Sequence, residues 1–327
     1  MSVPSSDPHA DFGELRSYMN TRIIGQPALV DRLLISLLAN GHLLVEGAPG
    51  LAKTTAIKCL ANAIEGDFHR IQFTPDLLPG DVTGTDVYRP QDGRFEFQPG
   101  PIFHNLVLAD EINRAPAKVQ SALLEAMGER QITVGQASYQ LPSLFMVMAT
   151  QNPIEQEGTY PLPEAQLDRF LMYVSIGHPP LSAEYEILRA VRQHALTGGT
   201  AQAVNAPQVP EAQIHHARRA ALSVHMADNV ESYIVALVGA TRESQDYDEH
   251  LPEWIRFGAS PRATLALDAC ARGHAWLNGR DYVSPEDVQA IAPDVLRHRV
   301  LLSFEAEADG ITGDHLVQIL LDRVPVP

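Results

Sequence analysis

Short apolar runs recur along the first half of the chain, and helical patterns separate several of them. The runs lie at 42–45, 70–73, 106–109, 144–149 and 171–176. Apolar strands that alternate with helices are typical of a parallel sheet covered by helices on both faces. Such sheets bind ligands at the carboxyl ends of their strands. The pattern therefore predicts an α/β fold with a parallel sheet sandwiched by helices.

Two stretches interrupt this alternation and predict β-hairpins. The first joins 86–89 to 94–97 through a turn that contains Asp92-Gly93, a dipeptide preferred in tight turns. The second joins 131–134 to 138–141 through residues 135–137. Inserted hairpins either contact a partner or have no binding role, and the pattern leaves both interpretations open.

The chain changes to helical patterns after residue 180. Helices are expected over 182–196, 211–221, 228–244, 261–277, 285–298 and 313–321. The stretch 197–210, rich in Gly, Ala, Gln and Pro, is typical of a linker. We therefore predict three parts: a flexible N-terminus over 1–10, an αβα domain over 11–180 and a helical domain over 181–327.

Composition narrows the class of protein. A length of 327 residues with 45% apolar residues is enough for the cores of two domains. The formal net charge of −16 argues against nonspecific electrostatic binding of DNA or RNA. Cys59 and Cys270 lie far apart among apolar neighbours, which favours buried, reduced thiols. No export leader or apolar run of membrane-spanning length is evident, so we expect a cytoplasmic protein without a transmembrane segment.

Phosphate binding is indicated by the stretch 47–55, which follows the first apolar run and opens a helical pattern. Its glycines let backbone N–H groups turn toward phosphate oxygens, and Lys53 adds a positive charge near the β and γ phosphates. The Thr54 hydroxyl can ligate Mg²⁺, and the N-terminal end of the helix attracts the same anion. Ala52 stands where the phosphate-loop pattern has glycine, and its methyl group is expected to be tolerated only with a negative φ. The predicted nucleotide-binding residues of this stretch are Gly47, Ala48, Pro49, Gly50, Leu51, Ala52, Lys53, Thr54 and Thr55.

Two acidic residues, Asp110 and Glu111, end the apolar run 106–109, about 55 residues after the phosphate loop. Hydrolysis of ATP needs one carboxylate to hold Mg²⁺, which suits Asp110, and another to activate the attacking water, which suits Glu111. Asn152 ends the next apolar run and can hydrogen-bond the γ-phosphate or the water. The guanine-reading pattern Asn-Lys-x-Asp does not occur, which favours ATP over GTP.

Two arginines extend the candidate site. Arg169 precedes the fifth apolar run and, in a ring, could reach a neighbouring subunit's γ-phosphate as an arginine finger. The alternative is a surface salt bridge with Asp168 or a nearby acid. Arg262 lies in the first turn of a predicted helix, where the helix dipole disfavours a cation by about 0.3–1 kcal/mol. An ATP phosphate would supply the missing anion, and the alternative is an exposed arginine at little cost.

Other chemistries find less support in the sequence. The 13 histidines are scattered without the zinc-protease pattern H-E-x-x-H, and two isolated cysteines cannot form a zinc finger. The stretch 258–262 lacks the last glycine of the serine-hydrolase elbow. Nucleotide hydrolysis therefore remains the leading interpretation.

From Asp11 onward, this run of motifs resembles the MoxR family of AAA+ ATPases. The motifs that carry the resemblance lie at 47–54, 73–81, 110–115, 149–153 and 162–170. The resemblance implies an AAA+ fold followed by an all-α lid, with the hairpins as the helix-2 insert and the pre-sensor-1 hairpin. It assigns Lys53 and Thr54 to Walker A, Asp110 and Glu111 to Walker B, Asn152 to sensor 1, Arg169 to the arginine finger and Arg262 to sensor 2. It also implies an adenine-side contact at Gly25 and Gln26, and an intersubunit role for Arg114.

The resemblance further implies hexameric rings that remodel, mature or activate protein complexes in a chaperone-like manner. Typical partners are proteins with a von Willebrand factor A (VWA) domain. A nucleotide-gated scaffold with slow turnover is an alternative, although the presence of both Glu111 and Arg169 favours hydrolysis. A DNA-linked motor or transcriptional activator is disfavoured by the acidic balance and by the missing Gly-Ala-Phe-Thr-Gly-Ala loop.

Overall fold

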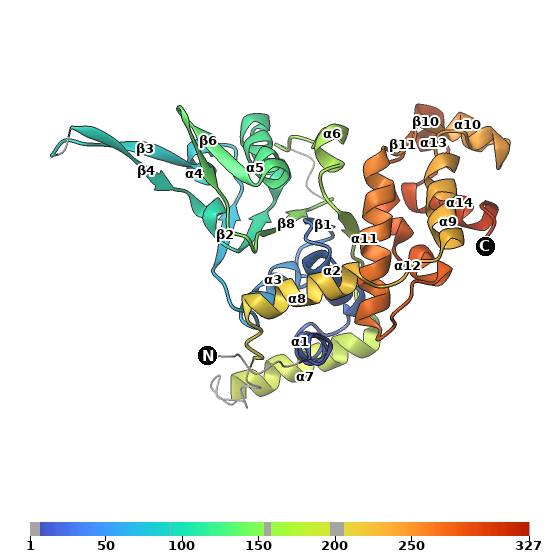
Figure 1. Ribbon diagram of the computed structural model, residues 1–327, viewed down its shortest axis with the longest axis horizontal. Coiled ribbons are helices and arrows are strands. Elements are labelled where there is room, and N and C mark those ends of the chain that lie inside the picture. The colour runs from blue at the N-terminus through green and yellow to red at the C-terminus, as the bar shows by residue number, and fades with distance from the viewer. Residues whose placement is uncertain (1–6, 92, 154–157, 197–205, 327) are drawn as a thin grey trace. The chain divides into compact units, whose positions relative to one another are not determined.

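Five strands form the main sheet of the computed structural model, in the order β2-β5-β8-β1-β9 (Figure 1). They are β1 (Leu43–Glu46), β2 (Phe68–Gln72), β5 (Leu106–Asp110), β8 (Met146–Gln151) and β9 (Met172–Ser175). The pairs β2–β5, β5–β8 and β1–β8 are parallel, and β5 is buried at every position. The predicted α/β fold with a parallel sheet is therefore confirmed. The structure describes residues 7–91, 93–153, 158–196 and 206–326.

Helices alternate with several of these strands, as the pattern predicts, and others precede or follow the strands of the sheet. They are α1 (Pro8–Arg22), α2 (Pro27–Leu38), α3 (Lys53–Ala61), α4 (Pro79–Thr83), α5 (Ala117–Glu129), α6 (Glu164–Leu167) and α7 (Leu181–Leu196), with 3-10 turns η1 (Pro101–Phe103) and η2 (Ile112–Arg114). Residues 8–10 fall in the segment predicted to be flexible, but they begin α1 because the Asp7 carboxylate accepts from the His9 N–H at 3.0 Å and caps the helix. The remaining part of that prediction, residues 1–6, lies outside the described residues.

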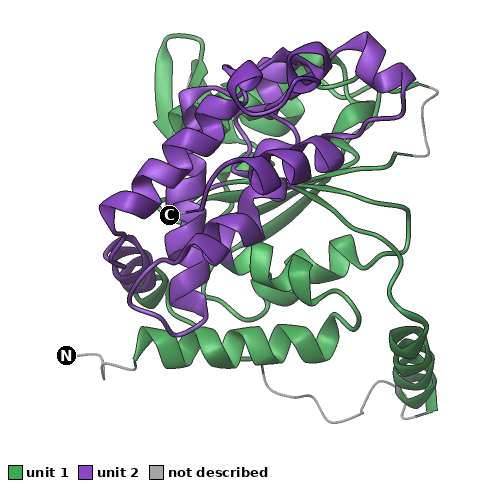
Figure 2. Cartoon of the chain, turned by 90° about the vertical axis from the view of Figure 1, so that its right-hand side faces the viewer, with its two compact units in different colours: residues 1–34, 42–162, 174–214 green, residues 35–41, 163–173, 215–327 purple. Residues whose placement is uncertain are grey.

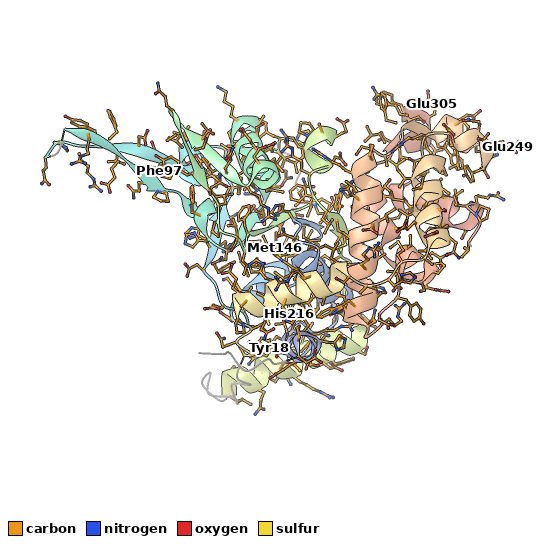
Figure 3. All side chains as sticks on the ribbon, in the orientation of Figure 1. Tyr18, Phe97, Met146, His216, Glu249 and Glu305 are labelled. Carbon is orange, nitrogen blue, oxygen red and sulfur yellow. The ribbon has the colours of Figure 1, made fainter. Side chains whose placement is uncertain are left out.

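Both predicted hairpins are present. The first pairs β3 (Gly84–Arg89) with β4 (Arg94–Pro99), and the second pairs β6 (Gln131–Val134) with β7 (Ala137–Gln140). Phe97, labelled in Figure 3, stacks on Tyr139 with ring centroids 3.8 Å apart, so an aromatic contact joins the two hairpins. Asp92 of the predicted turn lies outside the described residues.

The chain divides into two compact units, coloured separately in Figure 2. Unit 1 comprises Met1–Leu34, His42–Leu162 and Val174–Ile214, and unit 2 comprises Ile35–Gly41, Pro163–Tyr173 and His215–Pro327. The boundary predicted at residue 180 thus falls inside unit 1. The reason lies at Val209, whose carbonyl accepts from the Glu65 N–H at 2.8 Å and whose N–H donates to the Ala63 carbonyl at 3.0 Å. Of the predicted linker 197–210, residues 197–205 lie outside the described residues.

Unit 2 is mainly helical. Its larger helices are α9 (Asp228–Ala240), α11 (Pro261–Leu277), α12 (Pro285–Leu296) and α14 (Gly313–Arg323), while α8 (Glu211–Leu222) spans the division and α10 (Leu251–Trp254), η3 (Ser244–Asp246) and α13 (Phe304–Ala308) are short. A small antiparallel sheet of β10 (Ile255–Phe257) and β11 (Leu301–Leu302), which the pattern did not predict, lies within this unit. Cys59 and Cys270 are buried and are not joined by a disulfide, as predicted. No helix in the described part of the chain is long and apolar enough to cross a membrane.

Candidate functional site

The predicted phosphate loop connects β1 to α3. Gly47 has no room for a side chain, because a Cβ atom there would lie 2.5 Å from Ile176 Cγ1 and 2.9 Å from the Ile176 carbonyl oxygen. Gly50 adopts a left-handed conformation with φ +84°, which favours glycine. Ala48 and Thr54 are half-buried and Leu51 is buried, whereas Pro49 and Thr55 are exposed.

Ala52 corrects one expectation. Its φ is 60° and its ψ is 14°, so the prediction that its methyl group requires a negative φ is wrong. The left-handed conformation costs a residue with a side chain about 1–2 kcal/mol. Strain of this kind persists only where the surroundings impose it, and it often accompanies functional loops. Ala52 is the N-cap position of α3, so the strained residue determines where that helix begins.

Lys53 is oriented by two strand ends. Its Nζ atom donates to the carbonyl of Gly47 at 2.5 Å and to that of Gln151 at 3.0 Å. These carbonyls follow β1 and end β8, which are paired in the sheet. The lysine charge therefore lies at the carboxyl ends of the central strands, where the sequence predicts phosphates.

Asp110, at the end of β5, receives hydrogen bonds from both neighbouring strands. Its Oδ1 accepts from the Thr150 hydroxyl on β8 at 2.6 Å. Its Oδ2 accepts from Arg70 on β2, at 3.0 Å from Nε and 2.6 Å from Nη2. The side chain is 11% exposed, so these bonds fix the direction of a carboxylate that water reaches only in part.

Glu111 has an unusual backbone. Its φ of 57° and ψ of 51° are left-handed, and its N–H donates to the Thr150 hydroxyl at 3.0 Å. The carboxylate Oε2 accepts from Gln72 Nε2 at 2.9 Å and lies 3.1 Å from Arg114 Nε. Glu111 thus combines a strained backbone with a hydrogen-bonded carboxylate at the carboxyl end of a strand. Both features are typical of catalytic sites.

Asn152 follows β8 and is 6% exposed. Because Gln151 pairs with Glu46 of β1 and Ala149 pairs with Ala109 of β5, the ends of three neighbouring strands meet here. The structure thus brings the loop, Lys53, the acid pair and Asn152 to the carboxyl ends of neighbouring strands. Their roles in hydrolysis stay predictions.

Sequence reasoning missed the residues that hold the acid pair. Arg70 and Gln72 occupy alternate positions of β2, so they share a face, and Gln72 pairs in register with Asp110. Two polar residues separated by one apolar residue in a strand next to Walker B are the signal that could have identified them. The sequence marks Thr150 only as part of the motif 149–153, and the resemblance implies an intersubunit role for Arg114. In the structure Thr150 contacts both acids, and Arg114 contacts Glu111 of its own chain.

Gly25 and Gln26 contact the segment after β9. Gly25 has φ +80°, and a Cβ atom there would lie 2.7 Å from the Cβ of Pro179 and 2.8 Å from that of Ala183. Gln26 Nε2 donates to the Gly177 carbonyl at 2.8 Å. The turn between α1 and α2 therefore needs glycine for both its backbone conformation and its packing. The proposed contact with adenine stays a prediction.

The two predicted arginines lie in unit 2. Arg169 is half-buried. Arg262, in the first turn of α11, has its Nη1 3.6 Å from Asp168 Oδ2, and the Ser260 hydroxyl donates to the same oxygen at 2.9 Å. A carboxylate thus supplies at least part of the negative charge that the position of Arg262 requires.

The acid pair and the loop offer suitable ligands for Mg²⁺. This ion prefers oxygen donors and is usually held by one or two protein groups together with substrate phosphates and water. Thr54 supplies a hydroxyl and Asp110 a carboxylate. Each carboxylate oxygen has two acceptor positions, so the bonds from Arg70 and Thr150 leave capacity for a bound water. Among the described residues, no group of three or more His, Cys, Asp or Glu side chains could hold a metal ion. Phosphate and water oxygens would therefore have to complete the coordination of Mg²⁺.

Comparisons with known proteins agree with this geometry. Residues 42–172 match the family model of the ATPase family associated with various cellular activities (AAA), and residues 253–320 match that of the AAA lid domain. The chain is 45% identical over 313 residues to Chaperone MoxR1 of Mycobacterium tuberculosis, covering 93% of this chain and 79% of that protein. It is 32% identical to Protein MoxR of Paracoccus denitrificans, covering 98% of each.

A solved structure extends the likeness to three dimensions. It is a crystal structure of a Cytophaga hutchinsonii protein, provisionally named an ATPase, with a TM-score of 0.87 and 43% sequence identity. The alignment covers 98% of this chain and 96% of that chain. Because the matches at this level of identity span nearly the whole chain, this protein belongs to the MoxR family of AAA+ ATPases.

Proposed function

We propose that this protein hydrolyses ATP with Mg²⁺ and uses the energy to remodel, mature or activate a protein complex. The observation that carries the proposal is the meeting of Lys53, Asp110 and Glu111 at the carboxyl ends of adjacent strands. An ordinary turn needs neither a glutamate in the left-handed conformation nor a lysine that donates to the ends of two strands. Family membership supports the same conclusion.

The roles follow from the chemistry of each group. Backbone N–H groups of 47–52, apart from Pro49, which has none, bind the phosphates together with the start of α3 and Lys53. Thr54 and Asp110 would hold Mg²⁺, which would supply positive charge to offset that of the phosphates. Glu111 takes a proton from the attacking water, and Asn152 orients that water. Arg262 senses the γ-phosphate, and Gly25 with Gln26 contacts adenine.

If Oε2 is the atom that takes the proton, Glu111 must first change partners. In the structure its Oε2 accepts from Gln72 and lies beside Arg114, so those contacts compete with a water for the same oxygen. The structure therefore resembles a resting state in which the base is held back. Binding of nucleotide or of a neighbouring subunit would release it.

Assembly completes the site in the proposed function. A hexameric ring lets Arg169 of one subunit stabilise the transition state in the next, as arginine fingers do in related enzymes. The proposed partners are a VWA-domain protein and a client complex, on the ground of family membership.

Slow turnover is the second candidate, and the partners of Glu111 favour it. A nucleotide-gated scaffold would keep this carboxylate occupied by Gln72 and Arg114 for most of the time. The decisive measurement is the ATPase rate against protein concentration, with mass followed by light scattering with and without ATP and Mg²⁺. Specific activity that rises as an assembly of several chains forms supports the shared site, whereas nucleotide binding by a monomer with flat, slow turnover supports the scaffold.

Glu111→Gln tests the base directly. The variant is expected to bind ATP normally and to lose nearly all hydrolysis, because the amide cannot accept the proton. Normal turnover would refute the assignment of Glu111.

A further inference from the structure

Arg299, just beyond α12, holds the backbone around Arg169. Its Nη2 donates to the carbonyl of Asp168 at 3.3 Å and to that of Phe170 at 2.6 Å. Its Nη1 donates to the Leu171 carbonyl at 3.1 Å. These carbonyls lie on both sides of Arg169, so one guanidinium fixes the path of the chain through the predicted finger.

The two preceding residues continue this contact. His298 is buried, with its Nε2 3.3 Å from the Phe170 carbonyl. Arg297 Nη1 donates to the Tyr173 carbonyl at 2.6 Å. Arg297, His298 and Arg299 together form what we call the 297–299 clasp, which binds the segment 168–173 by four of its six carbonyls.

The burial of Arg299 is hard to explain by stability alone. Its side chain is 3% exposed, and within the described part of the chain it pairs with the carboxylate of Asp168, with Nε 2.9 Å from Oδ1. Burial lowers the pKa of Arg299, because removal from water disfavours the charged form, although Asp168 opposes this effect. Well-packed apolar residues often stabilise a protein as well as a buried ion pair does. A rigid fork of N–H donors, in contrast, defines the position of several carbonyls at once.

Asp168 links the clasp to Arg262. While Oδ1 pairs with Arg299, Oδ2 accepts from the Ser260 hydroxyl at 2.9 Å and lies 3.6 Å from Arg262 Nη1. The residue next to the predicted finger thus binds both the clasp and the predicted nucleotide sensor.

We propose that Asp168 and the 297–299 clasp are positioning residues for Arg169, and that through Asp168 they couple it to Arg262. The inference rests on the proposed function, in which Arg169 acts in a neighbouring subunit's site. All these residues belong to unit 2, shown in purple in Figure 2. When Arg262 turns to a phosphate of its own subunit, it leaves Asp168, and the balance of charges beside Arg169 changes. Nucleotide occupancy in one subunit thereby alters the finger that this subunit offers to the next.

Mixed rings separate this role from general stability. Glu111→Gln subunits cannot hydrolyse ATP but still donate a finger, whereas Arg169→Ala subunits keep their own catalytic groups but donate none. Mixing the two is expected to restore activity, because some Arg169→Ala sites receive a finger from a Glu111→Gln neighbour. Arg299→Lys keeps the charge but removes the forked N–H donors of the guanidinium. It is then added in one arm to the Glu111→Gln subunit, the finger donor, and in the other arm to the Arg169→Ala subunit, the recipient.

The inference predicts an asymmetric result. Arg299→Lys in the finger donor is expected to lower the restored rate about tenfold or more, since a misplacement of about 1 Å can cost 10²-fold. In the recipient the same change is expected to alter the rate less than twofold, because the recipient contributes no finger. Equal losses in both arms, or a loss only in the recipient, would overturn the inference.

Two controls keep the outcomes distinct. Arg272→Lys changes another arginine of unit 2, 16% exposed, which pairs with Asp268 at 2.9 Å and donates to the Val224 carbonyl. It is expected to have no effect that depends on the arm. If the unmodified pair of variants restores no activity although mixed assemblies form, the finger in the proposed function is wrong. If the pair restores activity but Arg299→Lys shows no asymmetry, the positioning role alone is wrong.

Discussion

Gln72 offers the most direct test of the resting state at the acid pair. Its Nε2 donates to Glu111 Oε2 at 2.9 Å, and Arg114 Nε lies 3.1 Å from the same oxygen. An oxygen that accepts both groups is less available to a catalytic water. Gln72→Ala removes the amide and is therefore expected to raise the basal ATPase rate.

The size of the effect follows from exposure. A hydrogen bond to a charged group contributes about 1.5–3 kcal/mol. Because Gln72 is exposed and the Glu111 side chain is 28% exposed, water competes for the bond, and we take about 1 kcal/mol, below that range. This energy corresponds to an increase of about fivefold in the population of Glu111 free of Gln72. Arg114 is 39% exposed, and an exposed ion pair adds only about 0.2–1 kcal/mol, so Arg114→Ala should raise the rate less.

The assay is single-turnover hydrolysis, with the protein in excess over ATP and concentrated enough to bind all of it. ATP affinity is measured separately by titration of a fluorescent ATP analogue. Single turnover removes product release from the rate. Gln140→Ala is the matched control, because Gln140 lies on another exposed strand of unit 1 and donates to Gln131 Oε1 at 2.8 Å. It should leave both rate and affinity unchanged.

Three results would refute this reasoning. A lower rate in Gln72→Ala with unchanged ATP affinity would mean that Gln72 orients Glu111 for catalysis. An unchanged rate would mean that the hydrogen bond contributes no resistance to release of the base. A rise that Gln140→Ala reproduces would point to a general loosening of unit 1.

Three further predictions concern stability. Ala52→Gly should leave the melting temperature nearly unchanged, because relief of left-handed strain of about 1 kcal/mol is offset by similar added freedom in the unfolded chain; a clear shift in a thermal melt would contradict this. Burial alone would raise the pKa of Asp287, but hydrogen bonds from His274 and Arg280 outweigh it and hold the pKa well below its usual range. Asp287→Asn should therefore cost about 3–5 kcal/mol in urea unfolding at pH 7, and the difference should shrink below about pH 4 as the wild type loses this contribution. Burial, with Arg299 nearby, lowers the pKa of His298 well below its ordinary value, so acid should destabilise the wild type by up to about 1.4 kcal/mol per pH unit below pH 6.5, with a smaller loss in His298→Gln.

Much of the architecture could be predicted because its signals are local in sequence. The apolar runs at 106–109 and 144–149 are buried strands in the structure. The phosphate loop and the acid pair are short contiguous motifs, so their place at strand ends follows from the parallel sheet. The two-stranded sheet of unit 2 escaped prediction because β11 has only two residues, too few to show a period of two.

Backbone strain was harder to predict. The left-handed conformations of Ala52 and Glu111 contradict the intrinsic preferences of both residue types. Tertiary context imposes them, for example through the hydrogen bond from the Glu111 N–H to Thr150, 39 residues away. The sequence marks position 52 as unusual, because the phosphate-loop pattern has glycine there. It contains no corresponding signal at Glu111.

The partners of the candidate catalytic groups depend on contacts that no local pattern contains. Arg70 reaches Asp110 across 40 residues because β2 and β5 pair in parallel register, and Arg299 reaches Asp168 across 131 residues. The position of Arg262 at a helix N-terminus indicates a need for negative charge, and Asp168 supplies at least part of that charge from within unit 2. An arginine that already has a carboxylate partner can exchange it for a phosphate. That exchange, rather than an unsatisfied charge, is the property a nucleotide sensor requires, because a sensor must have two states of comparable energy.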